Sequence, residues 1–291
     1  MDADLFLHKF GHLAQGEGSI KKLRDVILQL AASGKLVEQN PADEPAGVLL
    51  KKIETERKKL SKDGKIRLPK VTPSISPAEI PFKLPNNWAW ARLGSLGSIF
   101  NGNSINANEK KQKYTKKIQG YNYIATKDVD YMSRKINYEN GIKIPFDSKG
   151  FKIAHKGAVL ICAEGGSAGK KIAITEEDIC FGNKLYAIET FAGLFPRYLF
   201  YVYQSPYFYK EFSDTTTGII GGTSGSMPKI NQAVVKNTPL PLPPLAEQKR
   251  IIAKVDELMT LCDQLEAHIT HTQTLNTHLM DSLIHRMTEA A

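Results

Sequence analysis

Apolar residues near the N-terminus recur with the spacing of a helix that buries one side. Ser19 can cap this helix and Gly34 can end it. A second helix is predicted to start near residues 43–45, and its Glu54 and Lys58 are spaced for an i,i+4 ion pair. The stripe of the first helix consists of Ile20, Leu23, Val26, Ile27 and Leu30.

A proline period then replaces the helical one. Between residues 61 and 87, proline recurs at every fourth position from Pro69 to Pro85. Proline lacks an N–H group and clashes with the preceding helical turn, so this spacing predicts an extended, stiff connector.

The middle of the chain alternates short β-prone runs with turns rich in Gly, Asn and Ser. An aromatic segment, 196–212, has helical spacing, and its rings are expected to pack in a core. The expected strands are 88–93, 121–124, 158–162, 171–174 and 185–189.

The last 48 residues, 244–291, carry a heptad pattern whose seam advances in alternating steps of four and three. The pattern predicts one long helix that needs a partner helix, either in a coiled coil or in an ordinary bundle. The seam consists of Ile251, Val255, Leu258, Cys262, Leu265, Ile269, Thr272, Asn276, Leu279 and Leu283.

Charge separates the middle of the chain from its flanks. Residues 81–240 hold 21 Lys and Arg against 12 Asp and Glu, whereas the two flanks together hold 18 of each. The net charge of +9 therefore belongs to the middle segment, which favours a polyanionic partner such as nucleic acid.

Candidate chemistry adds little to this picture. The glycines of Gly165–Lys171 have the wrong spacing for a phosphate-binding Walker A loop, so a tight basic turn is expected. We find no catalytic constellation, and the three cysteines form no CxxC pair. No apolar run is long enough to span a membrane, and the acidic start Met1–Asp4 is unlike a signal peptide, so a cytoplasmic location is expected.

Residues 239–258 run from Pro-Leu-Pro-Leu-Pro-Pro-Leu-Ala-Glu-Gln into the heptad helix, and residues 23–37 are followed by Asp-Glu-Pro-Ala at 43–46. These segments resemble the conserved regions of a known family, the specificity subunits of type I restriction–modification systems. Residues 85–94 resemble the opening of that family's target-recognition domain, and 222–230 resemble its last loop.

The resemblance implies an α+β chain in which a mixed α/β target-recognition domain lies between helical regions. The expected division is an N-terminal helical region with its connector (1–80), the recognition domain (81–243) and a long C-terminal coiled-coil helix (244–291).

The resemblance also implies a non-catalytic reader of double-stranded DNA. Its helices would space two half-sites and dock methyltransferase subunits, with restriction (motor-nuclease) subunits further out. S-adenosylmethionine, ATP and magnesium would belong to those partner subunits, and this chain would hold no cofactor or metal.

Loop residues with basic, amide or hydroxyl side chains are the candidate DNA contacts. They are Asn101, Asn103, Asn106, Lys110, Lys111, Lys113, Lys116, Lys117, Lys127, Ser167, Lys170, Lys171, Thr223, Ser224 and Lys229. The candidate dimer or partner interface consists of Leu23, Ile27, Leu30, Ile251, Val255, Leu258, Leu265, Ile269, Asn276 and Leu279.

Family members usually carry two recognition domains, and this sequence shows one. It therefore reads either as a half subunit that rebuilds the whole as a homodimer, or as a truncated copy that acts as a coiled-coil assembly or inhibitory protein without reading DNA.

Overall fold

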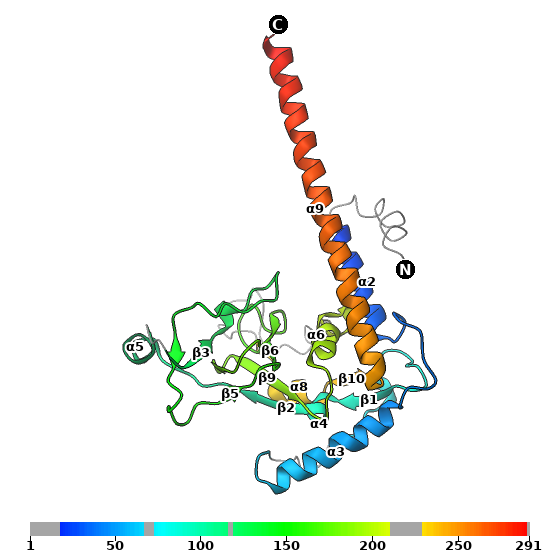
Figure 1. The fold of residues 1–291 in the computed structure, drawn as a ribbon, viewed down its shortest axis with the longest axis vertical. Coiled ribbons are helices and arrows are strands. Elements are labelled where there is room, and N and C mark those ends of the chain that lie inside the picture. Colours follow the sequence, from blue (N-terminus) through cyan, green and yellow to red (C-terminus); the bar gives the residue numbers. More distant parts are fainter. Residues whose placement is uncertain (1–17, 67–72, 116–118, 210–228, 290–291) are drawn as a thin grey trace.

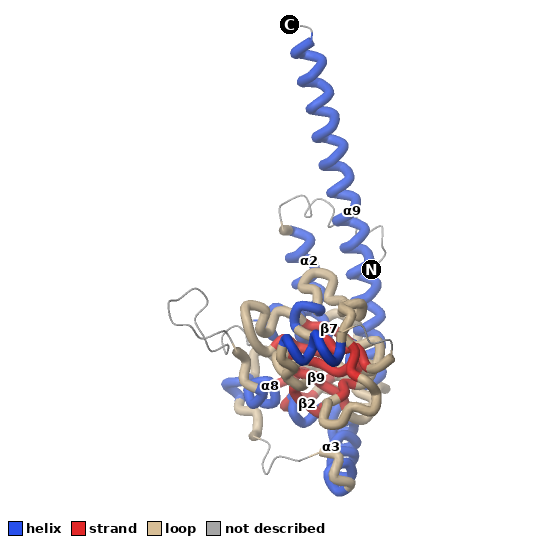
Figure 2. The backbone as a smooth tube through the Cα atoms, turned by 90° about the vertical axis from the view of Figure 1, so that its left-hand side faces the viewer, coloured by secondary structure: helices blue, strands red, loops and turns tan. Residues whose placement is uncertain are grey.

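A computed structural model describes residues 18–66, 73–115, 119–209 and 229–289. A mixed α/β body forms the base of the molecule, and one long helix, α9 (Leu245–Glu289), projects from it. Helix α3 (Ala46–Lys62) lies at the opposite end of the body from the tip of α9 (Figures 1 and 2). These elements confirm the expected α+β class.

Helix α2 (Ser19–Ala32) packs antiparallel against the lower half of α9 (Figure 1). Near its start Arg24 pairs with Asp263 at 2.6 Å and with Glu266 at 2.8 Å. Gly34 ends the helix as expected, because its φ of 71° lets the Lys35 N–H reach the Leu30 carbonyl at 2.9 Å. The predicted cap is wrong: the capping position is occupied by Gly18, and Ser19 is the first helical residue.

Helix α3 begins after Pro45, as expected, and the predicted Glu54–Lys58 pair forms at 2.7 Å. The connector departs from the fully extended prediction, because Pro77–Glu79 forms a short 3-10 helix, η2. Proline fits here because it stands in the first turn, where its missing N–H group has no helical partner.

The body contains two four-stranded sheets, with strand orders β2-β9-β6-β7 and β4-β3-β8-β5, and a two-stranded sheet of β1 and β10. Five strands lie where the sequence predicted them: β1 (Ala89–Arg92), β3 (Tyr121–Ile124), β6 (Val159–Cys162), β7 (Ile172–Ile174) and β9 (Leu185–Thr190). The other five were not predicted: β2 (Gly97–Asn101), β4 (Lys143–Ile144), β5 (Ile153–Ala154), β8 (Ile179–Phe181) and β10 (Pro239–Leu242).

Strand β10 closes the body by pairing antiparallel with β1, from Ala89 opposite Leu242 to Arg92 opposite Pro239. Its prolines are tolerated because β10 has a neighbour on one side only, so few backbone N–H groups are needed. The segments at the two ends of the body, residues 89–92 and 239–242, are therefore held side by side.

Helix α6 (Pro196–Gln204) is shorter than the predicted 196–212 helix. It stops because Ser205 precedes Pro206, which disfavours helical backbone. Its aromatic rings belong to the core as expected: Tyr198, Tyr201 and Tyr203 are buried, and so is Phe208 beyond its end.

The heptad seam of α9 divides into a buried and an exposed half. The predicted interface residues Ile251, Val255, Leu258 and Leu265 are buried in the chain's own core, together with Ile27 of α2. For these residues the partner-interface prediction is wrong, because α2 and α6 already cover them. Further interface candidates, Leu23, Leu30 and Ile269, are half-buried within the chain, whereas Asn276 and Leu279 are exposed.

Candidate nucleic-acid interface

Asn103 holds two loops together rather than presenting its amide to solvent. Its Nδ2 donates to the Gly150 carbonyl at 3.0 Å, and its Oδ1 accepts the Lys152 N–H at 2.8 Å. The Oδ1 of Asn101 accepts from Lys152 Nζ at 3.1 Å, and that of Asn106 accepts the Glu109 N–H at 2.8 Å at the start of helix α5 (Ala107–Glu109). These contacts favour structural roles for the three amides that the sequence nominated as base readers.

The basic cluster after α5, defined here as the Lys110 cluster, comprises Lys110, Lys111 and Lys113. Its lysines follow α5 in one turn of π-helix, η3 (Lys110–Tyr114). Lys110 places its ammonium 4.9 Å from the centroid of the Tyr123 ring, and Lys113 lies 3.3 Å from the Glu109 carboxylate. Lys111 is exposed. The structure thus brings part of the predicted phosphate-contacting group together on one loop.

The glycine-rich segment 164–171 is a tight turn, as expected. Gly165 and Gly169 adopt positive φ angles of 90° and 70°, and Lys170 N–H donates to the Ser167 carbonyl at 3.0 Å. Lys171 reaches the Thr126 carbonyl at 3.1 Å, which places this turn beside Lys127.

Lys229 lies at the same turn but pairs with Glu164 at 2.7 Å. That pair offsets part of its charge. The remaining candidates Lys116, Lys117, Thr223 and Ser224 lie outside the described residues.

Sequence reasoning missed further basic side chains on this surface, namely Arg134 and Lys135. They follow Tyr131 in a hairpin whose ends, Val129 and Ile136, pair antiparallel. The available signal was a run of six residues, with Asp130 and Ser133 as turn formers, between two β-branched residues, which is typical of a hairpin.

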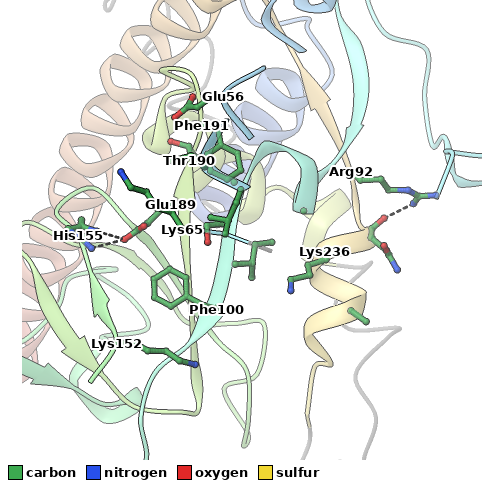
Figure 3. A pocket seen from close by; sticks show the side chains of 18 of the residues that line it. Glu56, Lys65, Arg92, Phe100, Lys152, His155, Glu189, Thr190, Phe191 and Lys236 are labelled. Atoms are coloured by element: carbon green, nitrogen blue, oxygen red, sulfur yellow. Dashed lines mark hydrogen bonds and ion pairs between the residues drawn. The ribbon is translucent and has the colours of Figure 1, made fainter. Parts of the chain in front are cut away.

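A groove of about 990 Å³ opens between α3, β2 and helix α8 (Gln232–Asn237). Figure 3 shows Lys65, Lys152 and Lys236 along it, and Arg92 at one end. Its carboxylates serve local structure: Glu189 accepts from His155 at 2.8 Å, and Glu56 accepts the Ala192 N–H at 2.5 Å. The two carboxylates of the groove are therefore both engaged in contacts within the chain, and its lysines are the groups left along it.

Buried thiols complete the inventory of reactive groups. Cys162, Cys180 and Cys262 are all buried, and burial raises the pKa of the Cys180 and Cys262 thiols to about 11. Thiols with raised pKa values are poor nucleophiles near neutral pH. Over the described ranges no three His, Cys, Asp or Glu side chains are grouped to hold a metal ion, and no helix is apolar and long enough to cross a bilayer.

A mixed α/β domain with basic loops, inserted between two helical segments that pack on each other, defines a recognition module carried on a helical scaffold. The chain belongs to the family described as the type I restriction modification DNA specificity domain, whose profile matches residues 85–272. Membership in this family confirms the resemblance seen in the sequence.

Two curated relatives from Escherichia coli are similar to nearly the whole chain. The EcoAI type I restriction enzyme specificity subunit is 33% identical over 290 residues, covering 93% of this chain and 45% of that protein. The EcoEI specificity subunit is 29% identical over 280 residues, covering 94% and 46%. The chain thus spans about half the length of the curated relatives it matches, and their designation as specificity subunits supports a non-catalytic class.

The fold has a solved counterpart. A chain from a study described as the structural basis of complex assembly and conformational transition of the type I R-M system aligns with a TM-score of 0.52 and 19% identity. The alignment covers 90% of this chain and 55% of the other. At that identity the likeness shows the shared fold alone.

Proposed function

We propose that residues 81–243 read one half-site of a split DNA sequence, and that two copies of the chain pair through α9 to present two such domains. The methyltransferase subunits of a type I complex would dock on the helices, and restriction subunits further out. S-adenosylmethionine, ATP and magnesium would then belong to those partners. The observation that carries the proposal is the exposed half of the α9 seam.

The exposed half repeats the face that the chain itself buries. An α-helix makes about five turns in 18 residues, so residues 18 apart lie on the same side. Leu261, Cys262 and Leu265 are buried against the body, and the residues 18 positions later are Leu279, Met280 and Leu283. Those three are 59%, 58% and 46% exposed. The upper half of α9 therefore offers a second apolar surface suited to a helix.

A second copy of α9 is the occupant that fits this surface. The surface begins beyond the first turns of α2, where Arg24 pairs with Glu266, so a partner helix can continue the packing of α2 along α9. An antiparallel pair of α9 helices would place the two bodies at opposite ends of the dimer. Site symmetry follows protein symmetry, so the target would be a split inverted repeat.

The assembly or inhibitory function remains the alternative, since it also uses the exposed seam. It differs in one respect, the basic middle segment, which has no role in a protein that never touches DNA. The charge excess of residues 81–240 and the basic loops therefore favour DNA reading.

The test is to co-express the 291-residue chain with a type I methyltransferase subunit and to map adenine methylation across the host genome. We expect one split, inverted-repeat motif. A stable complex with no motif would favour the assembly function, and an asymmetric split motif would refute the homodimer.

A double variant tests the role of the exposed α9 seam separately from that of the DNA-binding body. Leu279→Asp with Leu283→Asp places charges on the exposed apolar face and should yield a folded monomer and no motif. Thr274→Asp places a charge on the opposite side of the same part of α9. This matched control should keep the dimer and the methylation motif.

A further inference from the structure

A short hairpin presents an apolar tip in a basic surrounding. Its base is anchored: Val129 is 1% exposed, pairs with Ile136, and Asp130 N–H donates to the Lys135 carbonyl at 2.9 Å. Ile136 packs against the same buried cluster. The tip therefore stands on a fixed base rather than on a loose loop.

Two side chains fix the tip itself. The Asp130 carboxylate accepts the N–H groups of Met132 at 3.0 Å and Ser133 at 2.7 Å, and these hydrogen bonds lower the pKa of Asp130. Arg134 adopts a φ of 59°, a region that non-glycine residues seldom occupy. Its guanidinium donates to the Lys170 carbonyl and lies 4.9 Å from the centroid of the Tyr131 ring, which ties the hairpin to the 164–171 turn.

The fixed tip exposes its largest apolar side chain. Met132 is 82% exposed and Tyr131 39%. The strained backbone of Arg134 holds the methionine outward without packing it within the chain, and strain of this kind is found at binding sites, so the arrangement points to a contact with another molecule.

The charges around the tip indicate what that molecule is. Lys127 is 71% exposed and lies 4.0 Å from the Asp128 carboxylate, and Lys135 is exposed; the two lysines flank the tip in the sequence. Of the hairpin's two carboxylates, Asp128 is 5% exposed and accepts the Ala125 N–H at 2.9 Å, whereas Asp130 is exposed and accepts the N–H groups of the turn. An apolar tip flanked by cations complements DNA, where apolar side chains contact thymine methyl groups or the faces of base steps between two rows of phosphates.

We propose that Met132 enters a groove of the half-site and contacts base edges, while Lys127 and Lys135 contact phosphates on either side. Arg134 is a positioning residue that holds Tyr131 and the tip in place. This inference rests on the proposed DNA-reading function and names the element of the body that makes one of its base contacts.

The test measures binding of the complex of this chain with its methyltransferase subunit to two fluorescent duplexes. One duplex carries the motif found by methylation mapping, and the other has the same length and a scrambled sequence. Met132→Ala should weaken binding to the motif by about tenfold, the usual cost of one lost base contact, and leave the scrambled duplex unchanged. Met132→Leu should restore most of the loss.

A phosphate-contact variant provides the contrast. Lys135→Ala should weaken binding to both duplexes and reduce the slope of log K against log salt by ~0.9, whereas Met132→Ala should leave that slope unchanged. Arg134→Lys keeps the charge but not the planar fork, and should reproduce the Met132→Ala pattern more weakly.

The outcomes distinguish the two levels of the proposal. If the wild-type complex prefers the motif and Met132→Ala binds both duplexes like wild type, the hairpin inference is wrong and DNA reading stands. Equal losses on both duplexes with Met132→Ala would also overturn the inference. A wild-type complex that does not discriminate between the duplexes would overturn DNA reading and this inference together.

Discussion

Glu247 joins three separate segments of the chain, and replacing it should test how the body is attached to α9. The carboxylate is 1% exposed. It accepts the Trp88 indole N–H at 2.9 Å and a Gln39 amide N–H at 2.5 Å. Burial is the largest influence on the pKa of Glu247 and raises it, although the two hydrogen bonds lower it.

The loss in unfolding free energy depends on which buried hydrogen-bonding groups each substitution leaves without a partner. Glu247→Ala removes the acceptor of the buried Trp88 N–H, and leaving such a buried donor without a partner costs about 1–3 kcal/mol of unfolding free energy. Glu247→Gln keeps the shape of the side chain and one acceptor oxygen for Trp88. Its new NH₂ group would face the NH₂ group of Gln39, so the Gln39 amide must rotate to present its oxygen. We expect a cost of about 1 kcal/mol, the worth of one hydrogen bond.

The pH dependence has a definite sign. A carboxyl whose pKa is raised on folding is relatively stabilising at low pH, and this contribution is lost as pH rises from its ordinary value of 4.5 through its raised value. Glutamine does not titrate, so the cost of Glu247→Gln should be larger at pH 4 than at pH 7.

The assay is urea unfolding followed by tryptophan fluorescence, since the chain's only tryptophans, Trp88 and Trp90, lie at this junction. Measurements at pH 4 and pH 7 on wild type and both variants give the free energies. A cost of Glu247→Gln that is constant or grows with pH would refute the reasoning.

Three further predictions concern other parts of the body. Gly102→Ala would place a Cβ atom 1.9 Å from the Phe181 carbonyl oxygen. Thermal unfolding should therefore show that the free energy of unfolding falls by at least about 1–3 kcal/mol. Arg92 pairs with Glu79 at 2.5 Å and holds the pKa of that carboxyl at about 2, a contribution that is present above pH 4.5 and lost as pH falls toward 2. Arg92→Lys should therefore flatten the acid branch of the stability curve, measured by denaturant unfolding between pH 2 and pH 5. Replacing the Lys110 cluster with alanine should weaken binding to all duplexes and lower the salt slope by ~0.9 per lost contact; an unchanged slope would place the cluster in solvent.

The sequence predicted the elements that can be recognised from their own residues, whatever packs against them. Strand β3 was found in full, because Tyr121–Ile124 is a β-prone run beside Gly120. Gly34 ended its helix because only a residue tolerant of positive φ suits that position. Strand β10 was missed because its prolines argue against a strand, and nothing nearby reveals that it has a neighbour on only one side.

The candidate site was less predictable because its residues are defined by distant contacts. Asn103 resembled a base reader in the sequence, but its amide bonds to residues 47 and 49 positions away. The heptad pattern located the buried face of α9 correctly, but a period cannot tell which helix covers that face. Ile251 and Leu279 occupy the same seam. Only the fold shows that Ile251 is buried within the chain's own core and that Leu279 is exposed.

The pairing of α2 with α9 also sets the order in which the molecule can be completed during synthesis. Arg24 and its partner Asp263 are 239 residues apart. At ~5–20 residues per second a ribosome needs on the order of 10–50 s to make that stretch, and throughout it the apolar side of α2 lacks its contact with α9. Strand β1 likewise pairs only after β10 has been made. The core that α2, the sheets and α9 share is therefore completed only after α9 has left the ribosome.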